Sequence, residues 1–81
     1  MKVECAESLM DCNREIEFNY FDKRYSITYY EENGKRTISF CEFYKEPMHV
    51  RTADEALQLK IGSKTLMEIF AGLPDSVFDI Y

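Results

Sequence analysis

The chain has 81 residues, 46% of them apolar and 15% aromatic, and carries a net charge of −5 because 15 acidic side chains outnumber 10 basic ones. A chain of this size holds one hydrophobic core, so we expect a single domain over 1–81, and its acidic balance argues against direct binding to DNA or RNA. The sequence contains no apolar run long enough to span a bilayer, and acidic residues near its start argue against a secretory signal, so we expect a cytoplasmic protein without membrane contact.

A short amphipathic helix over 2–12 is the first element that the sequence predicts, because apolar side chains recur there at helical spacing with acidic ones between them. Two of the three cysteines of the chain, Cys5 and Cys12, would share one face of this helix. An odd number of cysteines without closely spaced pairs of metal ligands indicates a reducing compartment. It predicts no disulfide framework, no metal site and no cofactor.

Polar and apolar residues alternate three times in the middle of the chain, which is typical of strands with one buried face. We expect a three-stranded antiparallel meander of about 15–20, 24–31 and 36–43. The pair Asn33-Gly34 predicts a type I′ turn between the second and third strands, since both central positions of that turn need positive φ. A two-residue loop at Phe21-Asp22 would join the first two strands, although Phe fits positive φ poorly and a longer loop is the alternative.

These turns fix a register in which one face of the sheet is apolar and the other is polar. The predicted cross-strand pairs are Tyr29 with Ile38, Ile27 with Phe40, Phe18 with Tyr25 and Ile16 with Ile27. The polar face would carry Glu15, Glu17, Ser26, Thr28, Tyr30, Thr37, Ser39 and Cys41. The apolar face needs a cover, which the N-terminal helix and two short C-terminal helices would supply, so the predicted fold class is α+β.

The C-terminal half begins with 44–51, which has no clear period and in which Pro47 excludes a central strand. Thr52-Ala53-Asp54-Glu55 matches a capping box and predicts a helix over about 53–60 that stops at Gly62. Ser63 would cap a second helix, which ends at Gly72 and Pro74. The tail 77–81 is apolar enough to dock on the rest of the fold, either as a strand or as a turn.

Several segments together resemble a family of short uncharacterised proteins that Gram-positive gut bacteria, their prophages and mobile elements encode. These segments are Glu15 to Tyr20, Lys23 to Ile27, Asn33-Gly34-Lys35, Ser39 to Pro47 and Lys60 to Ile69. Glu42-Phe43-Tyr44-Lys45-Glu46-Pro47 is the most specific of them, while Phe21-Asp22 departs from the Asn-Gly type of pair expected there. The family has no known activity, so the resemblance implies a fold and a genomic context without a mechanism.

Catalytic machinery is hard to find in this sequence. His49 is the only histidine, and the three glycines are isolated, which argues against a phosphate-binding loop. Glu15 and Glu17 project from one strand face, but a solvated pair of acids is not a catalytic pair. An enzyme or a metal protein built on Cys41 and His49, or on the two helical cysteines, is therefore the disfavoured hypothesis.

We predict instead a non-catalytic protein-interaction module, because exposed aromatic side chains beside charged ones commonly anchor protein interfaces. The predicted contact residues are Tyr30, Phe43, Tyr44, Lys45, Glu46, Glu15 and Glu17. A narrower version is an inhibitor of a host nucleic-acid-handling or defence protein, similar in kind to anti-CRISPR proteins. The alternative is a self-assembling structural or accessory domain that pairs through the edge of the 15–20 strand. For the oligomeric state we expect a monomer or a weak homodimer. The basic residues near the two turns would lie at opposite ends of the meander, which argues against a nucleic-acid patch.

Overall fold

The alternating middle of the sequence forms three consecutive antiparallel strands in the computed structural model, which describes residues 1–81. These strands are β1 (Ile16–Tyr20), β2 (Lys23–Glu32) and β3 (Lys35–Glu42). The predicted register is confirmed: Ile27 pairs with both Ile16 and Phe40, and Glu32 pairs with Lys35 next to the turn. Opposite charges therefore meet beside the Asn33-Gly34 turn, and apolar side chains meet further along the hairpin.

Both hairpins turn through two residues with positive φ, as type I′ turns require. The φ angles are +56° at Asn33 and +77° at Gly34, and they are +48° at Phe21 and +62° at Asp22. The two-residue loop at Phe21-Asp22 is therefore confirmed, and no longer loop is needed. Phe21 itself is 81% exposed and makes an edge-on contact with the ring of Tyr20.

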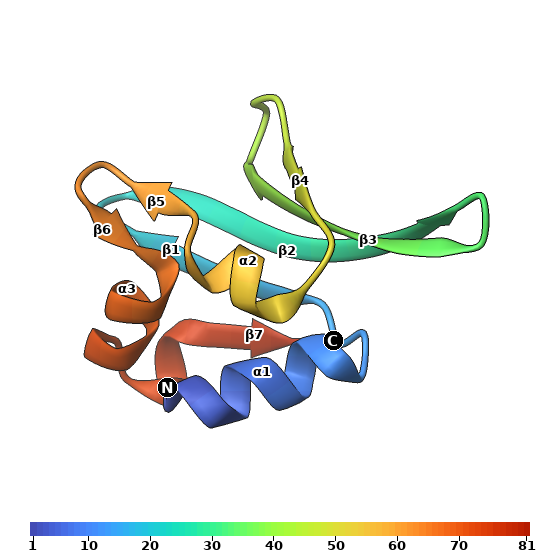
Figure 1. The fold of residues 1–81 in the computed structure, drawn as a ribbon. Helices are drawn as coiled ribbons and strands as arrows, with labels where there is room; N and C mark the ends of the chain where they lie inside the picture. Colours follow the sequence, from blue (N-terminus) through green and yellow to red (C-terminus); the bar gives the residue numbers. More distant parts are fainter.

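Two further strands extend the meander to a five-stranded sheet of order β4-β3-β2-β1-β7 (Figure 1). The strand β4 (Met48–Val50) was not among the predicted strands; it pairs with β3 at the edge of the sheet, which agrees with the interpretation that Pro47 excludes a central strand there. The tail forms β7 (Phe78–Ile80), which pairs with β1. The 15–20 strand is consequently an inner strand of the sheet.

Three helices cover one face of this sheet, as predicted: α1 (Val3–Asp11), α2 (Ala53–Leu57) and α3 (Leu66–Gly72) (Figure 1). The capping box of α2 is confirmed, since the Thr52 side chain accepts a hydrogen bond from the backbone N–H of Glu55. None of the three helices has the length and apolar character that crossing a bilayer requires.

The boundaries predicted around Gly62 are wrong, because a small hairpin separates α2 from α3. Strands β5 (Lys60–Ile61) and β6 (Lys64–Thr65) pair with each other, and Gly62 provides the turn between them with a φ of +65°. The helix α2 therefore ends before the hairpin, and Thr65 rather than Ser63 caps α3 in a second capping box with Glu68. A 3₁₀ turn, η1 (Asp75–Val77), leads into β7.

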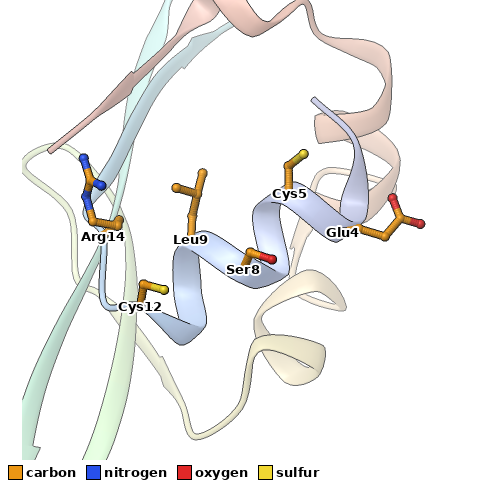
Figure 2. Close-up of a pocket in the computed structure, with 6 residues that line it drawn as sticks. All are labelled: Glu4, Cys5, Ser8, Leu9, Cys12 and Arg14. Carbon is orange, nitrogen blue, oxygen red and sulfur yellow. The ribbon is translucent and has the colours of Figure 1, made fainter.

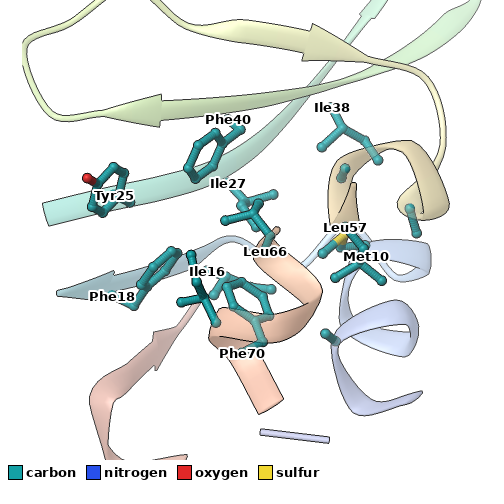
Figure 3. Packing of buried hydrophobic residues seen from close by; sticks show 14 of the residues in the cluster. Met10, Ile16, Phe18, Tyr25, Ile27, Ile38, Phe40, Leu57, Leu66 and Phe70 are labelled. Atoms are coloured by element: carbon teal, nitrogen blue, oxygen red, sulfur yellow. The ribbon is translucent and has the colours of Figure 1, made fainter. Parts of the chain in front are cut away.

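The core lies between the apolar face of the sheet and the three helices (Figure 3). Its largest fully buried side chains are Phe18, Phe70, Met10, Ile16, Ile27, Ile38 and Leu66. Phe18 is central among them, because the centroid of its ring lies 5.5 Å from that of Tyr25, 5.1 Å from that of Phe70 and 5.5 Å from that of Phe78. Edge-to-face and offset pairs of this kind are favourable beyond the area they bury.

Tyr29 was expected in the core and is half-buried at its margin, where its hydroxyl donates a hydrogen bond of 2.8 Å to the carbonyl oxygen of Arg14. Burial raises the pKa of Tyr29 from the ordinary value of 10.0 to about 12. The nearby Arg36 guanidinium, 5.8 Å from the Tyr29 ring, opposes this shift, but it does not outweigh the loss of solvation.

This shift predicts a loss of stability at high pH. The neutral phenol of Tyr29 is favoured in the folded chain, so its contribution is complete below pH 10 and is lost as pH rises through about 12. We expect urea unfolding between pH 9 and pH 12 to show a fall of about 1–2 kcal/mol, less than the full linkage because the side chain is half exposed. Tyr29→Phe should flatten this fall, whereas Tyr81→Phe should not, and equal curves for both variants would contradict the assignment.

Candidate functional site

The face of the sheet opposite the helices is not covered by any helix or strand (Figure 1). Small hydroxyl and thiol side chains form its centre, on neighbouring strands. The cross-strand pairs there are Glu17 with Ser26, Ser26 with Cys41, Thr28 with Ser39, Ser39 with His49, and Tyr30 with Thr37. We call this surface the open face.

Two residues of this predicted polar face are buried. Thr37 is 4% exposed and Ser39 is 8% exposed. Their cross-strand neighbours Tyr30 and His49 are large, and the two rings lie 5.7 Å apart in an edge-to-face arrangement. These two rings flank the hydroxyl side chains, so aromatic side chains border the open face at its end near β4.

Arg24 organises the opposite end of the open face. Its guanidinium forms ion pairs of 3.0 Å with Glu17 and 2.5 Å with Asp79, and it donates a further hydrogen bond of 3.2 Å to Asn19. Hydrogen bonds to the carboxylate of Asp79 and then to that of Glu17 raise the pKa of Arg24, and its guanidinium is protonated. One side chain on β2 thereby connects to β1 and β7.

The loop that joins β3 to β4 stands beside this ion-pair cluster. Phe43 donates its backbone N–H to the Arg24 carbonyl oxygen at 2.8 Å, and its ring centroid lies 6.0 Å from the guanidinium carbon of Arg24. The next residue, Tyr44, is 100% exposed and has a φ of +69°. The Cys41 thiol donates a hydrogen bond of 3.0 Å to the carbonyl oxygen of Lys45 and so connects the end of β3 to the loop.

Lys45 and Glu46 belong to a different surface from the two rings. They line a hollow of about 200 Å³ that lies between the loop and the β5–β6 hairpin. The other lining residues are Tyr25, Phe40, Glu42, Met48, Lys60 and Ile61. Burial, followed by the charge of Glu42, raises the pKa of the Tyr25 phenol in this hollow above its ordinary value of 10.0.

Glu15 and Tyr30 meet at a third place, beside the end of β1. They line another hollow of about 200 Å³ together with Asn13, Tyr29, Glu31 and Arg36. The predicted contact residues are thus distributed over three places: Phe43, Tyr44 and Glu17 around Arg24, Lys45 and Glu46 on the helix side of the loop, and Glu15 with Tyr30 at this end. Glu17 differs from the prediction in being held by an ion pair.

Sequence reasoning missed Arg24, Asp79 and His49 as parts of this surface. The alternating pattern placed Arg24 on the polar face, but its link to Asp79 depends on the pairing of β7 with β1, which no local pattern indicates. His49 was considered only as a catalytic or metal-binding residue. Its place beside Tyr30 follows from the pairing of β4 with β3.

The helix α1 carries a separate, wide and open groove of about 470 Å³ (Figure 2). Its lining residues are Glu4, Cys5, Ser8, Leu9, Cys12 and Arg14. Cys5 and Cys12 share this face, as predicted, and all three cysteines of the chain are free thiols. No group of three or more His, Cys, Asp or Glu side chains is arranged to hold a metal ion.

Comparison of the chain with models of protein families, with curated proteins and with solved structures finds no match.

Proposed function

We propose that this protein is a non-catalytic protein-interaction module that contacts its partner through Tyr44, Phe43 and the adjoining open face. The observation that carries the proposal is the state of Tyr44, a large ring that is 100% exposed on a backbone with a φ of +69°. A bulky residue at positive φ costs conformational energy, and this one recovers none of it through burial. Binding to another protein would provide that burial.

The surroundings of Tyr44 support the same proposal. Arg24 fixes the base of the loop through Phe43 and through its two carboxylate partners, so the exposed ring projects from a rigid support. Pre-ordered aromatic anchors lose little entropy on binding, and for that reason they are common in interface centres. The loop that carries the ring continues from β3, which contributes Thr37, Ser39 and Cys41 to the open face.

The proposal predicts that Tyr44→Asn separates stability from binding. Asn tolerates positive φ much better than Tyr, so the free energy of unfolding should rise by about 0.5–1 kcal/mol while partner binding is lost. Immobilised wild-type and variant proteins would be exposed to cell extract, and retained proteins quantified by mass spectrometry over increasing amounts of extract. A partner that saturates the wild-type protein should be lost from the Tyr44→Asn variant.

Tyr81→Ala is the matched control, because Tyr81 is also an exposed tyrosine, at 59%, and lies away from the loop. It should retain the partner at the wild-type level. If the wild-type protein retains no saturable partner, or if the Tyr44→Asn variant retains it equally well, the proposal is wrong.

The narrower idea of an inhibitor of a nucleic-acid-handling or defence protein stays a prediction. An inhibitor of that kind would display free carboxylates in place of phosphates. On the open face, Glu17 and Asp79 are instead paired with Arg24, so free carboxylates must be sought elsewhere, beginning with the exposed Glu31 and Glu32. Competition between labelled nucleic acid and this protein for a candidate target would test the idea.

Self-assembly is the second candidate function, and its predicted route is altered by the structure. The strand β1 pairs with β2 along its whole length and with β7 from Ile16 to Phe18, so only Asn19 and Tyr20, next to the turn, have a free edge. Any assembly of folded chains would use another surface. Light scattering over a range of protein concentrations distinguishes a monomer from a weak homodimer.

A further inference from the structure

The strand β2 is longer than its neighbour β1, and this difference leaves part of its edge unpaired. The pairing of β1 with β2 stops where Ile16 faces Ile27, while β2 continues to Glu32. The residues before Ile16 belong to the turn that follows α1, and they form no strand beside β2. The segment from Thr28 to Glu32 therefore has β3 on one side and no strand on the other.

The backbone groups along this free edge point outward at alternate residues. In a hairpin with a two-residue turn, the residues that flank the turn exchange hydrogen bonds, and bonded pairs then recur at every second position. Glu32 flanks the turn, so Tyr30 and Thr28 bond to β3, while Tyr29 and Glu31 direct their N–H and C=O groups away from it. No backbone hydrogen bond outside the regular elements involves Tyr29 or Glu31.

A hollow of about 200 Å³ adjoins these outward groups, and its net charge is negative because the carboxylates of Glu15 and Glu31 outnumber the Arg36 guanidinium. Glu15 and Glu31 are exposed carboxylates on its rim. The Arg36 guanidinium is already engaged, because it donates hydrogen bonds of 2.7 Å to the Met10 carbonyl oxygen and 2.8 Å to the Asn13 side chain. Arg14 is likewise directed to the carbonyl oxygen of Tyr81.

We propose that the edge from Tyr29 to Glu31 binds an extended basic segment of a partner protein, which adds to the sheet as a short strand in line with β1. This inference rests on the proposed function and names a partner chemistry for a second contact surface. Outward N–H and C=O groups at alternate residues are the recognition elements of strand addition. Basic side chains on either face of the incoming strand would meet a carboxylate, Glu15 on one and Glu31 on the other.

A second copy of the chain fits this edge poorly. Antiparallel pairing of two identical edges would bring Glu15, Glu31 and Glu32 of both copies into one interface, and like charges facing each other oppose strand pairing. These carboxylates therefore select against self-pairing and in favour of a basic partner.

The test uses the whole chain and two synthetic peptides, one alternating Lys with Val and one alternating Glu with Val. Backbone amide resonances would be followed by NMR during titration, together with hydrogen exchange. We expect the Lys peptide to shift the resonances of Tyr29 and Glu31 and to slow their amide exchange, and salt to weaken its binding. Absence of these effects, changes centred elsewhere, or equal binding of the Glu peptide would overturn the inference.

Glu31→Pro removes one outward N–H and one carboxylate without removing a hydrogen bond to β3, since edge positions tolerate proline. It should weaken binding of the Lys peptide by about tenfold or more. Asp54→Pro, in the first turn of α2 where proline is tolerated, also removes one N–H and one exposed carboxylate, so it is the matched control and should not change the affinity. If Glu31→Pro disturbs the fold, Glu31→Lys replaces it and should reverse the preference to the Glu peptide, while an unchanged preference would contradict the charge argument.

The two proposals fail separately. A partner that depends on Tyr44, with no peptide binding at the β2 edge, would leave the proposed function in place and remove this inference. Peptide binding that is equal in the wild-type protein and the Tyr44→Asn variant, with no partner dependent on Tyr44, would keep the edge site and remove the role of the loop.

Discussion

Phe18→Ala should lower the free energy of unfolding by about 3–5 kcal/mol, a loss comparable to the whole stability of a domain of this length. The side chain is fully buried, and its ring contacts the rings of Tyr25, Phe70 and Phe78. Removal of the ring leaves a cavity among three other rings that cannot all move into it. Urea unfolding followed by circular dichroism would measure the change, and we expect a largely unfolded population at room temperature.

The control for this result is Phe21→Ala in the same hairpin. Phe21 is 81% exposed and touches mainly Tyr20, so its removal should change the free energy of unfolding by less than about 0.5 kcal/mol. Phe18→Leu keeps part of the volume and should lie between the two. A stable, cooperatively folding Phe18→Ala variant would show that the arrangement of the core is wrong.

Asp79→Pro should detach β7 and convert the inner strand β1 into an exposed edge. The hydrogen bond from the Tyr81 N–H to the Glu15 carbonyl oxygen fixes the alternation of this ladder, so the N–H of Asp79 faces Glu17 on β1. Proline removes that donor and the carboxylate that Arg24 binds. We expect a loss of about 2–4 kcal/mol in the free energy of unfolding, together with association that increases with protein concentration.

Asp79→Ala separates the two effects, because it keeps the N–H and removes the ion pair with Arg24. The exposed ion pair alone should contribute no more than about 1 kcal/mol, and this variant should remain in the same oligomeric state as the wild-type protein. Light scattering and size-exclusion chromatography would measure both variants. An Asp79→Pro variant that scatters light like the wild type would contradict the view that β7 protects β1.

The register of the meander is readable from the sequence because its determinants are local. Asn33-Gly34 specifies the turn, and alternation on both sides of it allows only one pairing that buries Ile27 and Phe40 together. Even the Phe21-Asp22 turn follows from this register, although the residue types there are unfavourable. The two-residue loop at Phe21-Asp22 allows Tyr20 to pair with Lys23, so the ladder between the two strands extends to the turn.

The two outer strands and the hairpin before α3 are harder to predict, for different physical reasons. Three-residue strands such as β4 and β7 carry too few positions for a period, and their partners are distant in sequence. The error at Ser63 was avoidable, because Thr65 and Glu68 have the same capping-box spacing as Thr52 and Glu55. Gly62 was interpreted as the end of a helix, but it lies in the turn between β5 and β6.

The candidate site divides in the same way. The exposure of Tyr44 and the position of Tyr30 on the polar face follow from composition and alternation, which are local. The Arg24 cluster requires β7 beside β1, and the free edge of β2 requires knowing where β1 ends and α1 leaves the sheet. Neither is available before the strands are arranged in space.

The pairing of β7 with β1 has a consequence for how the protein is made. Both hairpins of the meander join residues close in sequence, so they can form while the chain is still emerging from the ribosome, whereas Phe78 must find Phe18 only after every other element has appeared. During translation the nascent meander therefore exposes an unprotected strand. We expect the yield of folded protein to depend on chaperones during the time between synthesis of the meander and synthesis of β7. Slower translation just before β7 should lengthen that time.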